Sequence, residues 1–582
     1  MNVREARTVM VLTGSHTITA GYGIHEIFRR PSVTLTARVG LPRSKADTLM
    51  PASASASAST SASHPPDYTQ YLVGAALDEA ERKGQDLAIF WPMRHGVIRD
   101  WQQMIALWSH VLFALLPVKR SANDSYILLS LPAPISRDTH TLLAQVFFQH
   151  FNAPALCIVE KPLLAAYGVG TMNATVVDLG WEGCDVTPVF ECQVQHNANV
   201  KSAVGARHCT LFLAHLLRRD QSIVSALTAL LRYKRKSNTS SSSAASTAQG
   251  AQGSGGGADD DEDAQLQDAL VALARQLVED GHVLDEDAVR SGASGLTAAG
   301  GDGGDDDDGN FDIAAALVEG RDKKTRAAMD EEEERRRAAL EAAHADDGLD
   351  EAVIASITGD EGQAGASTDE KAVLVQFRGL KLKVGPERFR FLEPLFRPEL
   401  LEGVRGADEV ALGDEPFGAG PFPDFGVARG GRFDGFVAPL AWPDWSRVAS
   451  LPSCIAQSIA SIDELDRRVT LWENLILHGS PAKIKTIQIE TISALSDHVA
   501  SAGTETGQVM GEPNPLQPRN VRALRVPDYF SEFKDRTDLA GFLGATVYAK
   551  LVFGDLQAKS YITKQNYNEM GPNAAYSVRP TT

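Results

Sequence analysis

The 582-residue sequence has few cysteines, no long apolar run and no excess of basic residues. Its five cysteines include no CxxC pair, and its 14 histidines show no ligand spacing with them. A disulfide framework and a zinc site are therefore not expected, and a reducing compartment is favoured. No stretch reaches about 18 apolar residues, so no membrane-spanning helix is predicted. The net charge of −19 disfavours direct nucleic-acid binding.

Strand and helix patterns alternate at both ends of the chain. Residues 8–40 and 126–134 have the apolar content of strands. Residues 68–84 and 101–116 carry apolar side chains at helical spacing. This alternation predicts an α/β fold.

Biased segments interrupt that pattern. Residues 51–63 are rich in Ser and Ala, and 237–372 are rich in Ser, Gly, Asp and Glu; both are predicted to be largely disordered. Within the second segment, 264–281 is predicted to form an amphipathic helix and 325–344 a polar one. Residues 412–430 are rich in Gly and Pro.

Four motifs resemble the actin family and occur in the family's order. They are "WPMRHGVIRDWQQMIALWSHVLF" (91–113), "FNAPALCIVEKPLLAAYGVG" (151–170), "VGPERFRFLEPLFRPELL" (384–401) and "YITKQNYNEMGPNAA" (561–575). The resemblance implies an actin-like fold, in which two α/β halves flank a central cleft, with long disordered, acidic insertions. The implied ranges are 1–180 for the first half, 181–236 for the start of the second, 237–372 for the insertion, 373–520 for the rest of the second half, and 521–582 for a segment returning to the first.

In the actin family, ATP and a divalent cation lie between two Gly-containing hairpins. By resemblance the first hairpin is "VLTGSHTITAGYG" (11–23), where Gly14 and Ser15 are kept. Leu12, His16 and Thr19 stand where the family has aspartate, glycine and lysine. A turn or surface histidine is the default interpretation of His16.

The second hairpin is "VVDLGWEGCDV" (176–186), where Asp178 and Gly180 are kept. Trp181 and Glu182 replace an aspartate and a glycine, and both changes oppose a bound phosphate. Asp178 is interpreted as the cap of a turn or a leftover metal ligand. Trp181 either fills the cleft as core or only covers it.

The remaining nucleotide-contacting positions are altered as well. Lys161 stands at the family's water-positioning glutamine, and a charged lysine cannot serve as a base. The adenosine-contacting turn reads "LHGSP" (477–481), in which Gly479 alone is kept. We therefore expect a degenerate pocket with no catalytic residue, no metal ligand and no cofactor, in a protein that is not an enzyme.

"VPDYFSEFKDR" and "GFLGATVYAK" resemble a fungal branch of actin-related proteins found in SWI/SNF- and RSC-type chromatin remodellers. The resemblance implies a nuclear scaffold subunit that contacts chromatin only indirectly. Its expected partners are a second actin-related protein, forming a heterodimer, and the helicase–SANT-associated helix of the remodeller ATPase; no membrane partner is expected. The basic cluster at 232–236 is either a nuclear-import signal or a solubilising run.

By position, a groove between the outer lower subdomains would receive the partner helix. Its lining would be Tyr167, Gly168, Thr546, Val547, Lys550 and Leu551. These residues are equally compatible with an ordinary core helix. Two other functions stay open: a nucleotide-binding actin-like switch and a cytoskeletal actin-related protein.

Overall fold

The computed structural model describes residues 3–24, 29–47, 67–242, 257–283, 372–407, 444–504, 521–534, 536–554 and 560–578. It divides into two compact units, one formed by Met1–Cys209 with Leu392–Thr582 and the other by Thr210–Phe391. The ranges inferred from the sequence divide the chain differently. The segments 51–63, 325–344 and 412–430 lie outside the described residues.

A six-stranded mixed sheet forms one half of the first unit. Its order is β18 (Ile562–Thr563), β10 (Ala155–Glu160), β9 (Tyr126–Leu131), β1 (Thr8–Thr13), β2 (Thr17–Tyr22) and β3 (Val33–Thr36). Strand β1 pairs in parallel with β9 and antiparallel with β2. All six residues of β1 are buried, which is typical of a strand covered on both faces.

The two faces of this sheet bury alternate residues of β1 in separate cores. Val9 and Val11 pack in a core with the helices α4 (Trp101–His110) and α5 (Arg137–Gln145). Met10 and Leu12 pack in the other core, with α6 (Lys161–Val169) and α17 (Ala540–Gly554). The period of two along a strand assigns each residue to its face.

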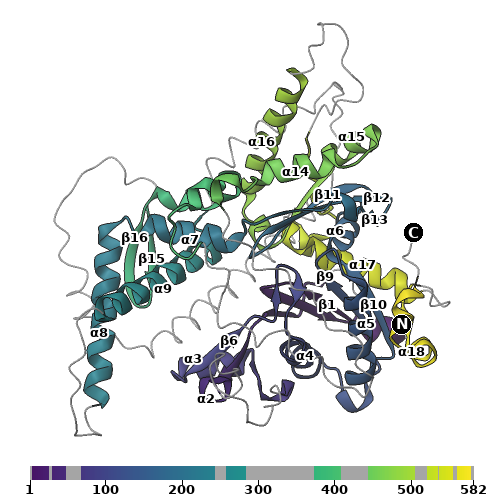
Figure 1. Ribbon diagram of the computed structural model, residues 1–582, viewed down its shortest axis with the longest axis horizontal. Helices are drawn as coiled ribbons and strands as arrows, with labels where there is room; N and C mark the ends of the chain where they lie inside the picture. Colours follow the sequence, from purple (N-terminus) through teal and green to yellow (C-terminus); the bar gives the residue numbers. More distant parts are fainter. Residues whose placement is uncertain are drawn as a thin grey trace, which may run out of the picture. The chain divides into compact units, whose positions relative to one another are not determined.

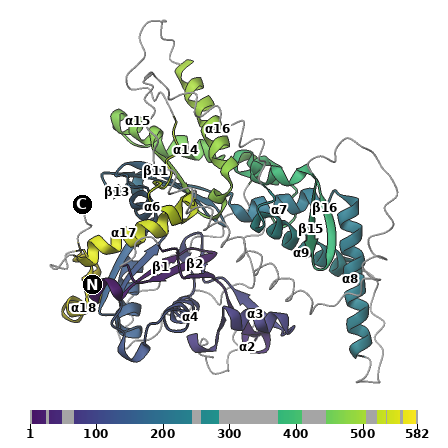
Figure 2. The same cartoon turned by 180° about the vertical axis from the view of Figure 1, so that it is seen from behind.

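A second sheet in the same unit has the order β13 (Gln193–Val194), β12 (Cys184–Phe190), β11 (Ala174–Leu179) and β17 (Leu475–His478), with β14 (Val200–Ser202) also pairing with β12. The helices α14 (Leu451–Ala460), α15 (Leu465–Glu473) and α16 (Lys485–Thr504) follow in this region. Helices α6 and α17 lie side by side in both views of the molecule (Figures 1 and 2). The α/β class predicted from the sequence is confirmed.

A small sheet of β5 (Leu72–Val73), β4 (Val39–Pro42) and β6 (Leu87–Phe90) carries the helices α2 (Arg43–Asp47) and α3 (Ala75–Arg82). The helix predicted over 68–84 is wrong in its first half. Residues 72–73 pair with β4 instead, and the helix begins only after Gly74, whose φ of 58° lies outside the helical region. The hairpin of β7 (Met93–Arg94) and β8 (Val97–Ile98) follows.

The second unit contains α8 (Gln221–Ser242), α9 (Gly257–Glu279) and the hairpin of β15 (Val373–Phe377) and β16 (Leu380–Val384), which lie together in both views (Figures 1 and 2). The boundary between the units falls within α7 (Ala206–Leu217). Helix α9 covers residues 264–279 of the helix predicted over 264–281, and it buries Leu270, Leu273 and Leu277 completely. Part of the range assigned to an insertion is thus integral to this unit.

Arg232 is the first residue of the basic cluster at 232–236. Its Nε lies 2.7 Å from a carboxylate oxygen of Glu262 on α9. The side chains of 234–236 lie outside the described residues. Among the helices that the structure describes, none combines the length and apolar character needed to cross a membrane.

Candidate functional site

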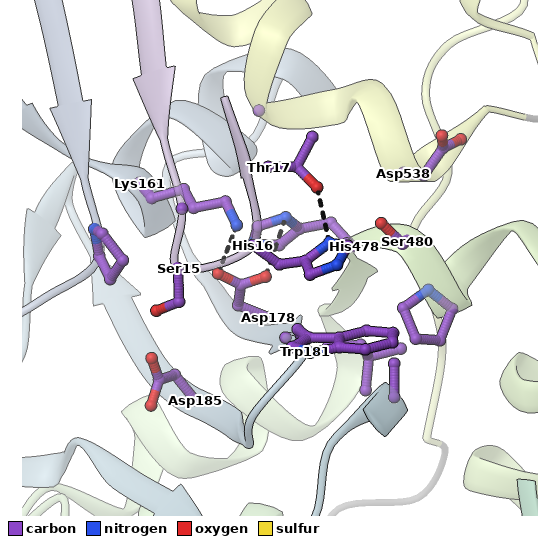
Figure 3. Close-up of a pocket in the computed structure, with 18 of the residues that line it drawn as sticks. Ser15, His16, Thr17, Lys161, Asp178, Trp181, Asp185, His478, Ser480 and Asp538 are labelled. Carbon is purple, nitrogen blue, oxygen red and sulfur yellow. Dashed lines mark hydrogen bonds and ion pairs between the residues drawn. The ribbon is translucent and has the colours of Figure 1, made fainter. Parts of the chain in front are cut away.

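A pocket of about 280 Å³ opens in the first unit at the ends of β1, β11 and β17 (Figure 3). Gly14, Ser15, Asp178, Gly180 and Gly479, the five positions kept from the family's nucleotide site, all line it. Residues more than 160 positions apart in sequence therefore meet at one site.

The first hairpin is a tight turn between β1 and β2. The Gly14 amide donates to the Thr17 carbonyl oxygen across 3.0 Å, which places Ser15 and His16 at the tip. The buried Trp108 indole N–H donates to the Thr13 hydroxyl at 3.0 Å, which ties the start of the turn to α4. The turn is therefore fixed at its base.

His16 lies in this turn, as predicted, but its ring is stacked against two indoles. Its ring centroid is 4.2 Å from that of Trp181, with 26° between the planes. The centroid of the Trp91 ring lies 5.0 Å from that of His16, with 15° between the planes. The two hairpins thus touch directly through rings, at the place where the family holds phosphates.

The β7–β8 hairpin adds two hydrogen bonds to this contact. The His95 amide donates to the Glu182 carboxylate at 2.6 Å, and the Gly96 amide donates to the Ser15 hydroxyl at 3.2 Å. Glu182 was expected to repel a phosphate through its charge. In the structure its carboxylate also closes one side of the pocket.

The backbone of the second hairpin is held by the start of α7. The Ala206 amide donates to the Gly180 carbonyl oxygen and the Arg207 amide to that of Trp181, each at 2.9 Å. The first amides of a helix have no partner within the helix. Here they donate to carbonyl oxygens of the loop, so the loop that carries Trp181 is anchored.

Lys161 and Asp178 form the central ion pair of the pocket, with Nζ and Oδ2 2.6 Å apart (Figure 3). The side chains are 22% and 10% exposed. Burial acts to raise the pKa of Asp178, but Lys161 outweighs it together with smaller contributions from His478 and Lys201, so the pKa is lowered. Lys161 therefore neutralises the one kept carboxylate.

His478 Nδ1 lies 3.8 Å from the other oxygen of Asp178. Burial lowers the pKa of His478 to about 4, against the opposing effect of Asp178. The imidazole is then neutral at pH 7, and Lys161 is the cation that balances Asp178. Asp178 is thus held by Lys161 through Oδ2 and is not a free turn cap. The described residues contain no group of three or more side chains suited to hold a metal ion.

A second pair lies beside the first. Lys201 Nζ is 3.4 Å from Asp185 Oδ1. Burial raises the pKa of Asp185 to about 6, with Lys201 opposing and Asp178 reinforcing that rise. The pocket thus contains charges that are largely matched within the chain.

Gly479 is the one residue kept in the family's adenosine-contacting turn, and its backbone conformation explains why. Its φ is 98°, a conformation that side chains rarely adopt. A Cβ at this position would lie 2.4 Å from the Leu179 carbonyl oxygen. Glycine is required here by backbone packing, so its presence does not by itself indicate a nucleotide.

These residues do not fit a magnesium–nucleotide. The hairpins contact each other where phosphates would lie, and the kept carboxylate is paired with a lysine. Glu182 would add negative charge beside the phosphates. Backbone amides that would cradle an anion need open approach, which the rings block.

The six residues of the expected groove lie on the α6–α17 helix pair. Leu551 is 55% exposed, and Tyr167, Val547 and Lys550 are half-buried. Gly168 and Thr546 are enclosed: the first approaches the Ala540 carbonyl closely, and the second donates its hydroxyl to Leu543 O at 2.6 Å. The Tyr167 ring meets that of Tyr548 edge-on at 5.1 Å. Four of the six side chains thus reach the surface.

The comparison with known families agrees with this geometry. Residues 3–255 match the actin family model. The chain is thus matched over less than half of its length. It has the actin-like fold expected from the four motifs, with sheets and helices in both halves of the first unit.

The chain is also similar to a curated relative from Schizosaccharomyces pombe, the "SWI/SNF and RSC complexes subunit arp9". The two are 22% identical over 515 residues, which cover 84% of this chain and 78% of the relative. The resemblance to actin-related proteins, including that fungal branch, is thereby confirmed.

Two features of this actin-like pocket could not be found from its motifs. The first is the β7–β8 hairpin with the residue Trp91 that precedes it: Trp91, His95 and Gly96 contact residues about 80 positions away. The second is the Lys161–Asp178 pair. The lysine substituted at 161 and the kept Asp178 were each visible separately, and their occurrence together was the available signal.

Proposed function

We propose that this chain is a non-catalytic actin-related subunit of an ATP-dependent chromatin-remodelling complex and acts in the nucleus. The similarity to the arp9 subunit over 84% of the chain carries this proposal. The length of that similarity matters, because it extends over most of both chains.

The pocket geometry supports a non-catalytic role. Hydrolysis requires a group that positions water and accepts its proton. Lys161 stands at that position as a cation bound to Asp178 at 2.6 Å. The energy of remodelling would then come from the ATPase subunit, with this chain as a scaffold.

The proposed partner contact is the exposed edge of the α6–α17 pair. Tyr167, Val547 and Leu551 offer apolar surface there, and Lys550 is placed to meet an acidic residue. An amphipathic helix gains most of its affinity from a few such anchors. The partners would be the helicase–SANT-associated helix of the ATPase and a second actin-related protein, while chromatin is reached through them.

The first experiment is affinity isolation of the tagged full chain from its own cells, in wild-type and Val547→Asp forms. We expect the wild type to bring down a remodeller ATPase and a second actin-related protein in equal amounts. Val547→Asp should lower ATPase recovery about tenfold, since burying an unpaired carboxylate in an apolar contact is costly.

Leu551→Asp is the companion variant, because a side chain that is 55% exposed tolerates charge without unfolding. Leu465→Asp is the matched control: that leucine is 48% exposed on α15 and should leave recovery unchanged. Recovery of cytoskeletal motors in place of a remodeller would overturn the proposal in favour of a cytoskeletal role. If Val547→Asp and Leu551→Asp recover as much ATPase as the control Leu465→Asp, the α6–α17 edge is not the site that binds the partner helix.

A nucleotide-binding switch is the second candidate, because about 280 Å³ of the pocket remains beside the ion pair. Calorimetric titration of the purified chain with Mg-ATP decides between the two. We expect no heat of binding up to millimolar nucleotide and no nucleotide released on denaturation. Binding in the micromolar range would establish the switch and reject a degenerate pocket.

A further inference from the structure

Three aromatic rings from three separate segments stack together beside the pocket, and two of them, His16 and Trp181, line it. Trp91 precedes β7, His16 is at the tip of the first hairpin, and Trp181 is in the second hairpin. All three are half-buried, so the stack forms part of the wall rather than the deep core. We refer to Trp91, His16 and Trp181 as the aromatic latch.

Two polar side chains beside the latch accept hydrogen bonds from within the chain. The Ser15 hydroxyl accepts from the Gly96 amide, and the Glu182 carboxylate accepts from the His95 amide. The bond to Ser15 joins the β7–β8 hairpin to the first hairpin, and the bond to Glu182 joins it to the second hairpin. The contacts therefore connect all three segments pairwise.

In an actin-like protein these hairpins would be joined by a ligand that contacts both of them. Here the chain provides the connection itself. We propose that the aromatic latch, with the Ser15 and Glu182 bonds, replaces the nucleotide as the element that holds the pocket closed. Opening and closing of the pocket is then independent of nucleotide, whichever complex the protein joins.

The stacked rings set how much the loss of one ring should shift the equilibrium between the closed and open pocket. A stacked aromatic pair contributes enough to change an opening equilibrium by about tenfold. His16 belongs to both stacked pairs, so its removal should have the largest effect of the three. The helix-anchored backbone of Trp181 limits how far that loop can relax to compensate.

Hydrogen–deuterium exchange of the full chain tests the latch. In wild type, we expect slow amide exchange at 13–17, 93–98 and 180–183, unchanged by adding Mg-ATP or Mg-ADP. His16→Ala and Trp181→Ala should each speed exchange in all three segments by about tenfold or more. Trp181→Phe keeps a stacking ring and should restore most of the protection.

His150→Ala is the matched control. That histidine is also half-buried and contacts the rings of Tyr68 and Phe151, but none in the latch. It should leave the three segments unchanged. The proposal is overturned if His16→Ala alters only its own turn, or if nucleotide slows exchange in the wild type. Either result is independent of whether a remodeller is recovered with the tagged chain.

Discussion

Replacing Gly544 with alanine is expected to prevent stable folding. Gly544 lies where α17 crosses α6, and a Cβ there would be 1.7 Å from the Leu164 carbonyl oxygen. That oxygen is backbone, so no side-chain rotation relieves the clash. The helices would have to separate, which costs at least about 3 kcal/mol. Circular dichroism melting and the soluble yield would measure this loss.

Gly541 provides a control on the same helix. A Cβ at this position would meet its nearest neighbour, the Leu12 Cδ2 atom, at 3.7 Å, which is an ordinary contact. Alanine also favours helix over glycine by roughly 0.5–1 kcal/mol. Gly541→Ala should therefore melt at or slightly above the wild-type temperature. A Gly544→Ala protein with a wild-type melting temperature would contradict the close crossing.

Replacing Lys161 with methionine is expected to destabilise the protein by about 3–5 kcal/mol at pH 7. The change leaves the Asp178 carboxylate, 10% exposed, without its cation. Asp178→Asn in the same chain should recover most of that loss, because no buried charge remains. Chemical denaturation of the two single variants and the double variant gives the coupling free energy.

The effect of Lys161→Met should depend on pH in a defined direction. The pKa of Asp178 in the folded protein is lowered, so its pair contributes stability above the ordinary aspartate pKa. That contribution is lost as pH falls through the lowered value. The difference between wild type and variant should therefore be largest near neutrality and shrink under acidic conditions.

Lys83→Met is the control for this experiment. Lys83 Nζ and Glu79 Oε1 are also 2.6 Å apart, but both side chains are more than half exposed. Exposed pairs contribute little, so its removal should leave stability nearly unchanged. A similar loss from Lys83→Met, or no coupling between Lys161 and Asp178, would contradict the role assigned to burial.

The motifs determined the fold because each one is local and strongly patterned. Neighbouring residues are enough to predict the structure of several segments: the β1 strand, the turn at Gly14 and the segment before α6. The family order of four such motifs then predicted which strands and loops come together. The loss of the pocket's usual residues, at Leu12, Thr19 and Trp181, was equally visible.

Local patterns failed where a partner far away in sequence decided the outcome. Residues 68–84 have the apolar spacing of a helix. In the first half of this range, however, pairing of Leu72–Val73 with β4 outweighs the helical propensity. Helix α9 looked like part of an insertion because its flanks are of low complexity. Its burial of leucines within the second unit follows only from tertiary packing.

The sequence by itself determined that this is an actin-like α/β chain with an altered nucleotide site. Only the tertiary structure decided what those alterations do together. Lys161 and Asp178 neutralise each other, and His16 and Trp181 stack, because folding brings positions 17 and 165 residues apart into contact. Each substitution alone removes a ligand contact, whereas in space the substituted side chains contact one another.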